Sequence, residues 1–156
     1  MGVEGGLNYQ TFNVVSSIGS PLVQPPSQKN YIFAGLVGQV TVGQPQLLPA
    51  PKVQYFDLKK ISYACTVNSG LKAVSCTILV AGLKSNNRSV FKELVYNPGP
   101  VTDISVKQFS SAEFPGGTDG FTNLVGVTVS VISSAVTSGL TNVLFDNVGY
   151  SACVGP

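Results

Sequence analysis

Three cysteines carry the most specific chemistry in this chain of 156 residues. Cys65 and Cys76 lie in two strand-like runs, on either side of an Asn68-Ser69-Gly70 turn. A two-residue Gly70-Leu71 loop of the Gly-first type would place residues 65 and 76 opposite one another in a β-hairpin. We therefore favour a Cys65–Cys76 disulfide that closes this hairpin, which indicates an oxidising, extracellular environment.

Other states of the cysteines stay open. Three cysteines allow three choices of pair, and in a cytosolic protein they would more often be reduced, buried residues. The favoured pairing leaves Cys153, near the C-terminus, without a partner. Cys153 would then be buried in the last strand or form an intermolecular bridge.

The chain contains no histidine. This excludes the Ser-His-Asp and Cys-His mechanisms and every zinc site that needs an imidazole ligand. The sequence also has no Cys-x-x-Cys pair and no phosphate-binding glycine loop followed by a helix. Most hydrolase classes are therefore excluded, and we expect no cofactor.

The carboxylates are the remaining groups that could act as acid and base or bind a cation. They are Glu4, Asp57, Glu93, Asp103, Glu113, Asp119 and Asp146. No two of them show the spacing typical of a glycosidase or lyase. Asp57 is expected to point into solvent, toward Lys59 or Lys60. Asp103, Glu113, Asp119 and Asp146 could meet at one end of the protein, where Asp119 and Asp146 are the candidate ligands of a structural Ca²⁺, although ordinary turn carboxylates explain the same residues.

Aromatic side chains are the usual platforms of carbohydrate-binding modules. The chain has six Tyr and eight Phe but no Trp. Tyr31, Tyr63 and Tyr96 are the candidates for stacking on a sugar. All three fall in or beside expected strands, where tyrosines are more often core or cross-strand partners.

Composition favours one extracellular domain without nucleic acid as a partner. Hydrophobic residues make up 44% of the chain and charged residues only 10%, so the expected surface is polar and nearly neutral. The basic residues are scattered and form no stripe that could hold a phosphate backbone. The longest uncharged stretch, 120–145, is too polar to span a bilayer. Asn87-Arg88-Ser89 is an N-glycosylation sequon, which fits secretion.

Alternation of β-branched and polar residues dominates the chain and predicts an all-β protein with little or no helix. The expected strands are Leu7–Val15, Tyr31–Val42, Val53–Val67, Leu71–Leu83, Ser89–Tyr96, Ile104–Phe109, Phe121–Ile132 and Asn142–Ser151. The prolines in Ile18–Pro26 and Gln44–Lys52 indicate extended connections. Eight short antiparallel strands joined by Gly and Pro turns are typical of a β-sandwich or jelly roll. We expect residues 7–156 to form this single domain and residues 1–6, which lack the features of a signal peptide, to be a linker.

Three short motifs resemble small secreted proteins of filamentous ascomycetes. They are Phe56-Asp-Leu-Lys-Lys-Ile-Ser-Tyr-Ala-Cys65, Val74-Ser-Cys-Thr-Ile78 with Gly82, and Leu144-Phe-Asp-Asn-Val-Gly-Tyr150. The resemblance implies a jelly roll with a hairpin disulfide at Cys65 and Cys76. Asp146 and Tyr150 match the family as structural residues, while the N-terminal third departs from its pattern. Some proteins of this kind, as in the rice blast fungus, are elicitors that trigger the hypersensitive response of plants.

The first hypothesis is a secreted, non-enzymatic fungal elicitor that is recognised by a host surface protein. The second is a carbohydrate-binding module for a cell-wall glycan, with or without calcium. The third is a small polysaccharide-active enzyme that uses two converging carboxylates. Exposed tyrosine rings would favour the second hypothesis, and two acids in one cleft would favour the third.

Overall fold

The computed structural model describes residues 3–4, 7–10, 13–16, 23–24, 26, 30–35, 46–67, 72–100, 106–136 and 141–155. In these residues every regular element is a β-strand, so the all-β prediction is confirmed. The strands are β1 (Val3–Glu4), β2 (Leu7–Gln10), β3 (Asn13–Ser16), β4 (Val23–Gln24), β5 (Asn30–Gly35), β6 (Gln46–Pro49), β7 (Val53–Val67), β8 (Lys72–Ala73), β9 (Cys76–Lys84), β10 (Ser89–Tyr96), β11 (Lys107–Gln108), β12 (Ser110–Glu113), β13 (Leu124–Ser134) and β14 (Asn142–Val154).

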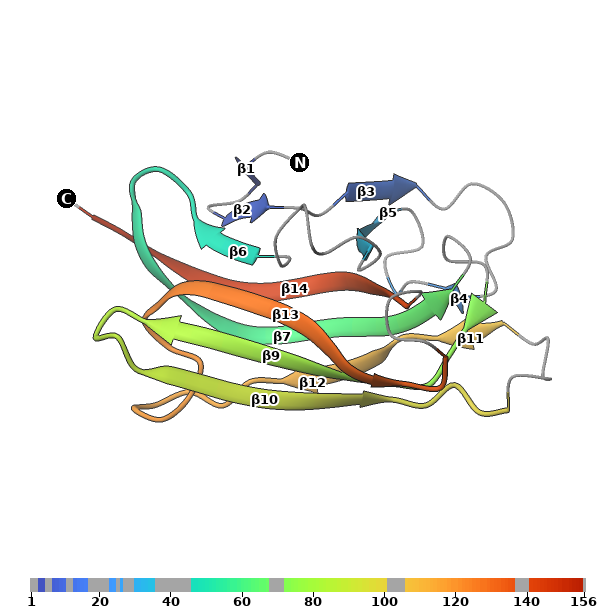
Figure 1. Cartoon of the computed structure of the whole chain (residues 1–156). Helices are drawn as coiled ribbons and strands as arrows, with labels where there is room; N and C mark the ends of the chain where they lie inside the picture. The colour runs from blue at the N-terminus through green and yellow to red at the C-terminus, as the bar shows by residue number, and fades with distance from the viewer. Residues whose placement is uncertain are drawn as a thin grey trace.

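Two groups of antiparallel strands enclose the core, as Figure 1 shows for the long strands. In one group β12 and β8 pair with β7, which is followed by β14, β5 and β3. In the other group the order is β10, β9, β13, β6, β2 and β1. A bridge between Leu124 on β13 and Phe56 on β7 joins the two groups. The result is sandwich-like and nearly barrel-shaped.

The core follows from alternation along the strands. On β9 the residues facing inward are Cys76, Ile78, Val80, Gly82 and Lys84, whereas Leu83 points outward. One continuous cluster of buried apolar residues includes β9, β7, β13 and β14. Because period two continues to the end of β9, it places the charged Lys84 on the inward side.

The Cys65–Cys76 disulfide is confirmed, with Cα atoms 6.2 Å apart. The expected hairpin register is wrong by two residues, because Thr66 pairs with Ala73 and the amide of Val74 donates to the carbonyl oxygen of Cys65. The chain leaves this pairing at Val74 and Ser75, and β9 then pairs with β10 and β13. The disulfide therefore joins the two groups of strands. The Asn68-Ser69-Gly70 turn lies outside the described residues.

Two proline-containing segments that were expected to be connections contain strands. Val23–Gln24 is β4, which pairs with β11, and Gln46–Pro49 is β6. Pro49 is tolerated because β13 pairs only with Gln46 and Leu47, so Pro49 lies beyond that ladder. Val3–Glu4, inside the expected linker, pairs with β2. The described residues include no helix long and apolar enough to cross a membrane.

Candidate functional site

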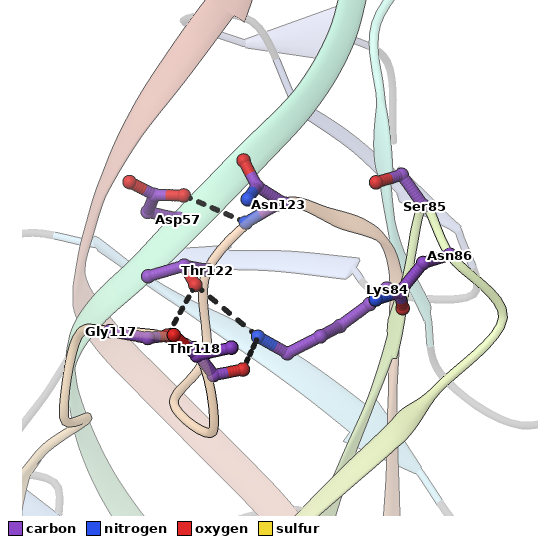
Figure 2. Close-up of a pocket in the computed structure, with 8 residues that line it drawn as sticks. All are labelled: Asp57, Lys84, Ser85, Asn86, Gly117, Thr118, Thr122 and Asn123. Carbon is purple, nitrogen blue, oxygen red and sulfur yellow. Dashed lines mark hydrogen bonds between the residues drawn. The ribbon is translucent and has the colours of Figure 1, made fainter.

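A cleft of about 360 Å³ opens between the β9–β10 turn and the loop that connects β12 to β13. Its lining residues, drawn in Figure 2, define what we call the polar cleft: Asp57, Lys84, Ser85, Asn86, Gly117, Thr118, Thr122 and Asn123. All of them except the glycine have polar side chains. The cleft therefore offers hydrogen-bond donors and acceptors in place of an apolar surface.

Lys84 is the most unusual residue of the polar cleft, because its side chain is charged and the residue is only 4% exposed. Its Nζ donates to the carbonyl oxygen of Thr118 at 2.9 Å and to Oγ1 of Thr122 at 3.3 Å (Figure 2). Both acceptors are neutral. Since an ammonium group carries three N–H donors, these two bonds leave one donor for a ligand.

The loop that supplies Thr118 and Thr122 is held by its own backbone. The amide of Gly120 donates to the carbonyl oxygen of Gly117, and the amide of Phe121 donates to that of Pro115. Thr122 Oγ1 also donates to the carbonyl oxygen of Gly117 at 2.8 Å. The wall opposite Lys84 is therefore preformed.

Asp57 is fixed at the other side of the polar cleft. Its Oδ1 accepts the backbone amide of Asn123 at 2.9 Å (Figure 2). Asn123 has a positive φ of 54° and accepts the amide of Ser85 through its carbonyl oxygen. The expectation that Asp57 points toward Lys59 or Lys60 is wrong, because the carboxylate caps the start of β13 instead. Its second oxygen has no hydrogen-bond partner among the described residues.

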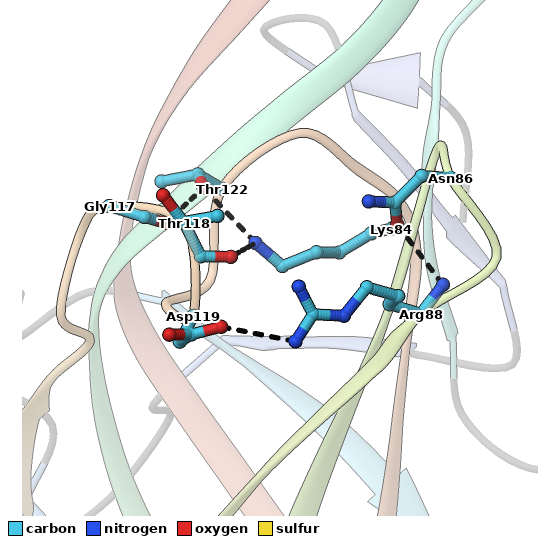
Figure 3. Close-up of polar contacts among 7 residues, drawn as sticks. All are labelled: Lys84, Asn86, Arg88, Gly117, Thr118, Asp119 and Thr122. Atoms are coloured by element: carbon cyan, nitrogen blue, oxygen red, sulfur yellow. Dashed lines mark hydrogen bonds and ion pairs between the residues drawn. The ribbon is translucent and has the colours of Figure 1, made fainter.

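An exposed ion pair stands beside the polar cleft. Arg88 and Asp119 approach to 3.1 Å, and Figure 3 shows that they join the β9–β10 turn to the facing loop. Neither residue lines the cleft. A surface ion pair of this kind contributes about 0–1 kcal/mol to stability, so it strengthens the link between the turn and the facing loop only slightly.

Two of the three tyrosine candidates for sugar stacking are buried and cannot stack on a ligand. Tyr63 and Tyr96 are buried, with ring centroids 6.4 Å apart in an edge-to-face pair. Their hydroxyl groups donate to the carbonyl oxygens of Val95 and Gln108. Their proposed role as sugar platforms is therefore wrong, because β7 and β10 turn both rings into the core. Tyr31 lies on β5 opposite Val15, and its side chain lies outside the described part.

The proposed calcium ligands are placed in separate surroundings. Asp119 pairs with Arg88 in the loop before β13, whereas Asp146 lies within β14, opposite Ser62 on β7. Across the described residues, no group of three or more Asp, Glu or Cys side chains forms a possible metal site. Asp103 lies outside the described residues, so calcium binding stays a prediction without a site.

Two further residues are positioned clearly. Asn87 is exposed in the β9–β10 turn, where a glycan could be attached. Cys153 is half-buried on β14, opposite Tyr55 on β7. A hydrogen bond between the Tyr55 hydroxyl and the Cys153 thiol raises the pKa of Tyr55.

Lys84, Thr122 and Asn123 are site residues that sequence reasoning missed. The alternation of Ile78, Val80 and Gly82 already predicts that Lys84 faces inward, so a signal for a buried cation was present. Nothing in the sequence indicates that the 115–123 loop covers it. Comparison with protein-family models and with curated protein sequences found no match.

Proposed function

We propose that the protein binds a glycan in the polar cleft and does not cleave it. The observation that supports this proposal is that Lys84, with one ammonium donor left over, and Asp57, with one carboxylate oxygen left over, both line the same cleft. Sugar hydroxyls donate and accept hydrogen bonds, so a site with both kinds of group suits them. The walls are held by backbone hydrogen bonds, which limits the entropy lost on binding.

The carboxylates of the region favour binding over hydrolysis. Most glycosidases need two carboxyl groups on either side of the scissile bond. Among the described residues that line the polar cleft, Asp57 is the only acid, and Asp119, which does not line it, pairs with Arg88. We therefore favour the hypothesis of a glycan-binding protein over that of a polysaccharide-active enzyme.

None of the described residues that line the cleft is aromatic, so hydrogen bonds set the expected affinity. A hydrogen bond exchanged with water contributes about 0.5–1.5 kcal/mol, and a bond to a charged group about 1.5–3 kcal/mol. A few such bonds correspond to a Kd on the order of 1 mM to 1 μM. Detection should therefore use high ligand concentrations.

Isothermal titration calorimetry with neutral and acidic cell-wall oligosaccharides tests this proposal. Asp57→Asn preserves the shape of the side chain and one acceptor for the Asn123 amide, but removes the charge. We expect it to weaken binding at least tenfold, whereas the matched Asp119→Asn control keeps wild-type affinity. Absence of binding to the whole panel, or equal affinities for wild type and Asp57→Asn, would overturn the proposal.

A second candidate function is the elicitor, a secreted fungal protein recognised by a host surface protein. It is favoured by the exposed face of β10, where Phe91 and Val95 are 65% and 64% exposed. Among the described strands, β10 pairs only with β9. Exposed apolar side chains on such a strand are a common feature of protein interfaces. Leaf infiltration should show cell death with wild type and Asp57→Asn, and none with a Phe91→Ser/Val95→Ser variant. Equal responses to all three proteins would contradict this surface, and no response to wild type would remove the elicitor hypothesis.

A further inference from the structure

We infer that Asn87 is an N-glycosylation site whose glycan stands at the rim of the polar cleft and restricts access to it. The attachment of the glycan is independent of the proposed function, whereas the effect on ligand access rests on that function. Asn87-Arg88-Ser89 is the only triplet in the chain with the Asn-X-Ser/Thr pattern, X not being proline.

The turn presents the sequon to solvent. β9 ends at Lys84 and β10 begins at Ser89, and residues 85–89 are all exposed. Asn87 has a positive φ of 62°, and its backbone amide donates to the carbonyl oxygen of Lys84 at 3.0 Å. Its side-chain amide makes no hydrogen bond to a described residue. Nδ2 is therefore free to react.

The reaction needs a polyprenyl-diphosphate-linked oligosaccharide and the transferase of a secretory pathway. A bond forms between Nδ2 of Asn87 and the anomeric carbon of the sugar. The bond from that carbon to the diphosphate oxygen breaks, and the polyprenyl diphosphate leaves with the electron pair. One amide proton is transferred to a base of the transferase, so no oxidant or reductant is required.

The neighbours of Asn87 place the glycan at the rim. Ser85 and Asn86, on one side of it, line the polar cleft. Arg88, on the other side, reaches Asp119 in the facing loop at 3.1 Å (Figure 3). An oligosaccharide on the residue between them would stand where the two walls approach each other.

The turn is also fixed, so the backbone that carries the glycan has a defined position. The amide of Lys84 donates to the carbonyl oxygen of Arg88 at 2.8 Å, and Asn86 Oδ1 accepts the amide of Arg88 at 3.1 Å (Figure 3). The amide of Ser85 donates to the carbonyl oxygen of Asn123 on the far wall. A glycan attached to this fixed turn would remain near the opening of the cleft.

Expression in a yeast secretory host with an added leader tests the attachment. We compare wild type, Ser89→Ala, which destroys the sequon, and Ser89→Thr, which keeps it. Intact mass should show an endoglycosidase-sensitive glycan on wild type and Ser89→Thr and none on Ser89→Ala. Wild-type protein of unmodified mass would overturn the inference.

Access to the cleft is tested on the same proteins. Amide hydrogen exchange of residues 85–88 and 117–123 should be slower in glycosylated wild type than in Ser89→Ala, and identical exchange would overturn the rim position. Oligosaccharides should bind Ser89→Ala at least fivefold more tightly, and equal affinities would overturn the restriction of access. If neither form binds a saccharide, the proposed function fails and the restriction fails with it, while mass and exchange still decide attachment and position.

Discussion

Lys84 on β9 donates a hydrogen bond from Nζ to the carbonyl oxygen of Thr118, 2.9 Å away in the loop that precedes β13. The two residues are 34 positions apart in the chain, and their contact joins the inward end of a strand to the wall of the polar cleft. Burial of an ammonium group is costly unless its hydrogen bonds are made. The loop supplies two of them, so the folding of the loop and the burial of Lys84 depend on each other.

Replacement of Lys84 by methionine should loosen this loop. Lys84→Met keeps a long apolar side chain but leaves the carbonyl oxygen of Thr118 without its donor, so we expect the free energy of unfolding to fall by about 1–2 kcal/mol. Urea denaturation measures this loss, and amide exchange of residues 117–123 should become faster. Lys72→Met, at an exposed position of β8, is the control. Wild-type stability and exchange in Lys84→Met would show that the ammonium group does not hold the loop.

Gly120 and Gly116 form a matched pair within the same loop. A Cβ at Gly120 would collide with the carbonyl oxygens of Pro115 and Gly116, whereas a Cβ at Gly116 would meet open space. Gly120→Ala should therefore destabilise the protein by about 1–3 kcal/mol, as steric overpacking commonly does, and should weaken saccharide binding. Gly116→Ala should stay within about 0.5 kcal/mol of wild type. Thermal unfolding compares the two variants. Equal melting temperatures would contradict the backbone conformation described for this loop.

The sequence predicts the strands that alternate clearly and misses those that do not. The expected bounds of Val53–Val67 and Ser89–Tyr96 coincide with β7 and β10, because β-branched and aromatic residues recur there with period two. β12 contains only Ser110, Ser111, Ala112 and Glu113 and is ordered by its pairing with β7. Such an edge strand has no apolar pattern of its own, so its existence depends on tertiary contacts.

The polar cleft could be predicted only in part for a related reason. The inward direction of Lys84 follows from the alternation of β9, but its acceptors come from a loop with no periodic pattern. The Cys65–Cys76 pairing was predicted correctly, but from a hairpin register that is wrong by two residues. The chain leaves the first hairpin at Ser75, whose carbonyl oxygen accepts the amide of Ala135 beyond β13. Local turn rules contain no information about that distant partner.

The Cys65–Cys76 bond should contribute stability by restricting the unfolded chain. Its two residues are 11 positions apart, and closing a loop of this size stabilises a protein by about 2–3 kcal/mol on the chain-entropy model. A Cys65→Ala/Cys76→Ala variant should lose this amount in urea denaturation under oxidising conditions. The control variant Cys153→Ala, which keeps the disulfide, should not show this loss of stability in urea denaturation. If a reductant lowers the stability of the double variant as much as that of wild type, the contribution does not come from this disulfide.

Two buried threonines should respond to valine with opposite signs. The Thr66 hydroxyl is buried without a hydrogen-bond partner among the described residues, whereas Thr141 Oγ1 lies 2.7 Å from Ser134 Oγ. Thr66→Val removes an unsatisfied polar group and should stabilise the protein by about 1 kcal/mol. Thr141→Val breaks a partly buried hydrogen bond and should destabilise the protein by about 1–2 kcal/mol. Chemical denaturation gives both values, and a loss of stability in Thr66→Val would indicate that its hydroxyl has a partner.

Tyr96 should make the protein less stable in alkaline solution. Its residue is only 1% exposed, and burial raises the pKa of the phenol to about 12 from the ordinary value of 10.0. The folded protein therefore retains this proton to higher pH than the unfolded chain does. The resulting stability is complete below pH 10.0 and is lost as the pH rises toward about 12. Over that range we expect the free energy of unfolding to fall by about 2–3 kcal/mol.

Urea denaturation at closely spaced pH values tests this expectation, and the ultraviolet absorbance of tyrosinate follows the ionisation directly. Tyr96→Phe leaves the carbonyl oxygen of Gln108 without its donor, so it should cost about 1 kcal/mol at neutral pH. Between pH 10 and pH 12 the free energy of unfolding of this variant should fall less steeply than that of wild type. Burial also raises the pKa of Tyr63, so Tyr63→Phe should remove a second part of the decline. A full wild-type decline in Tyr96→Phe would show that another group releases the proton.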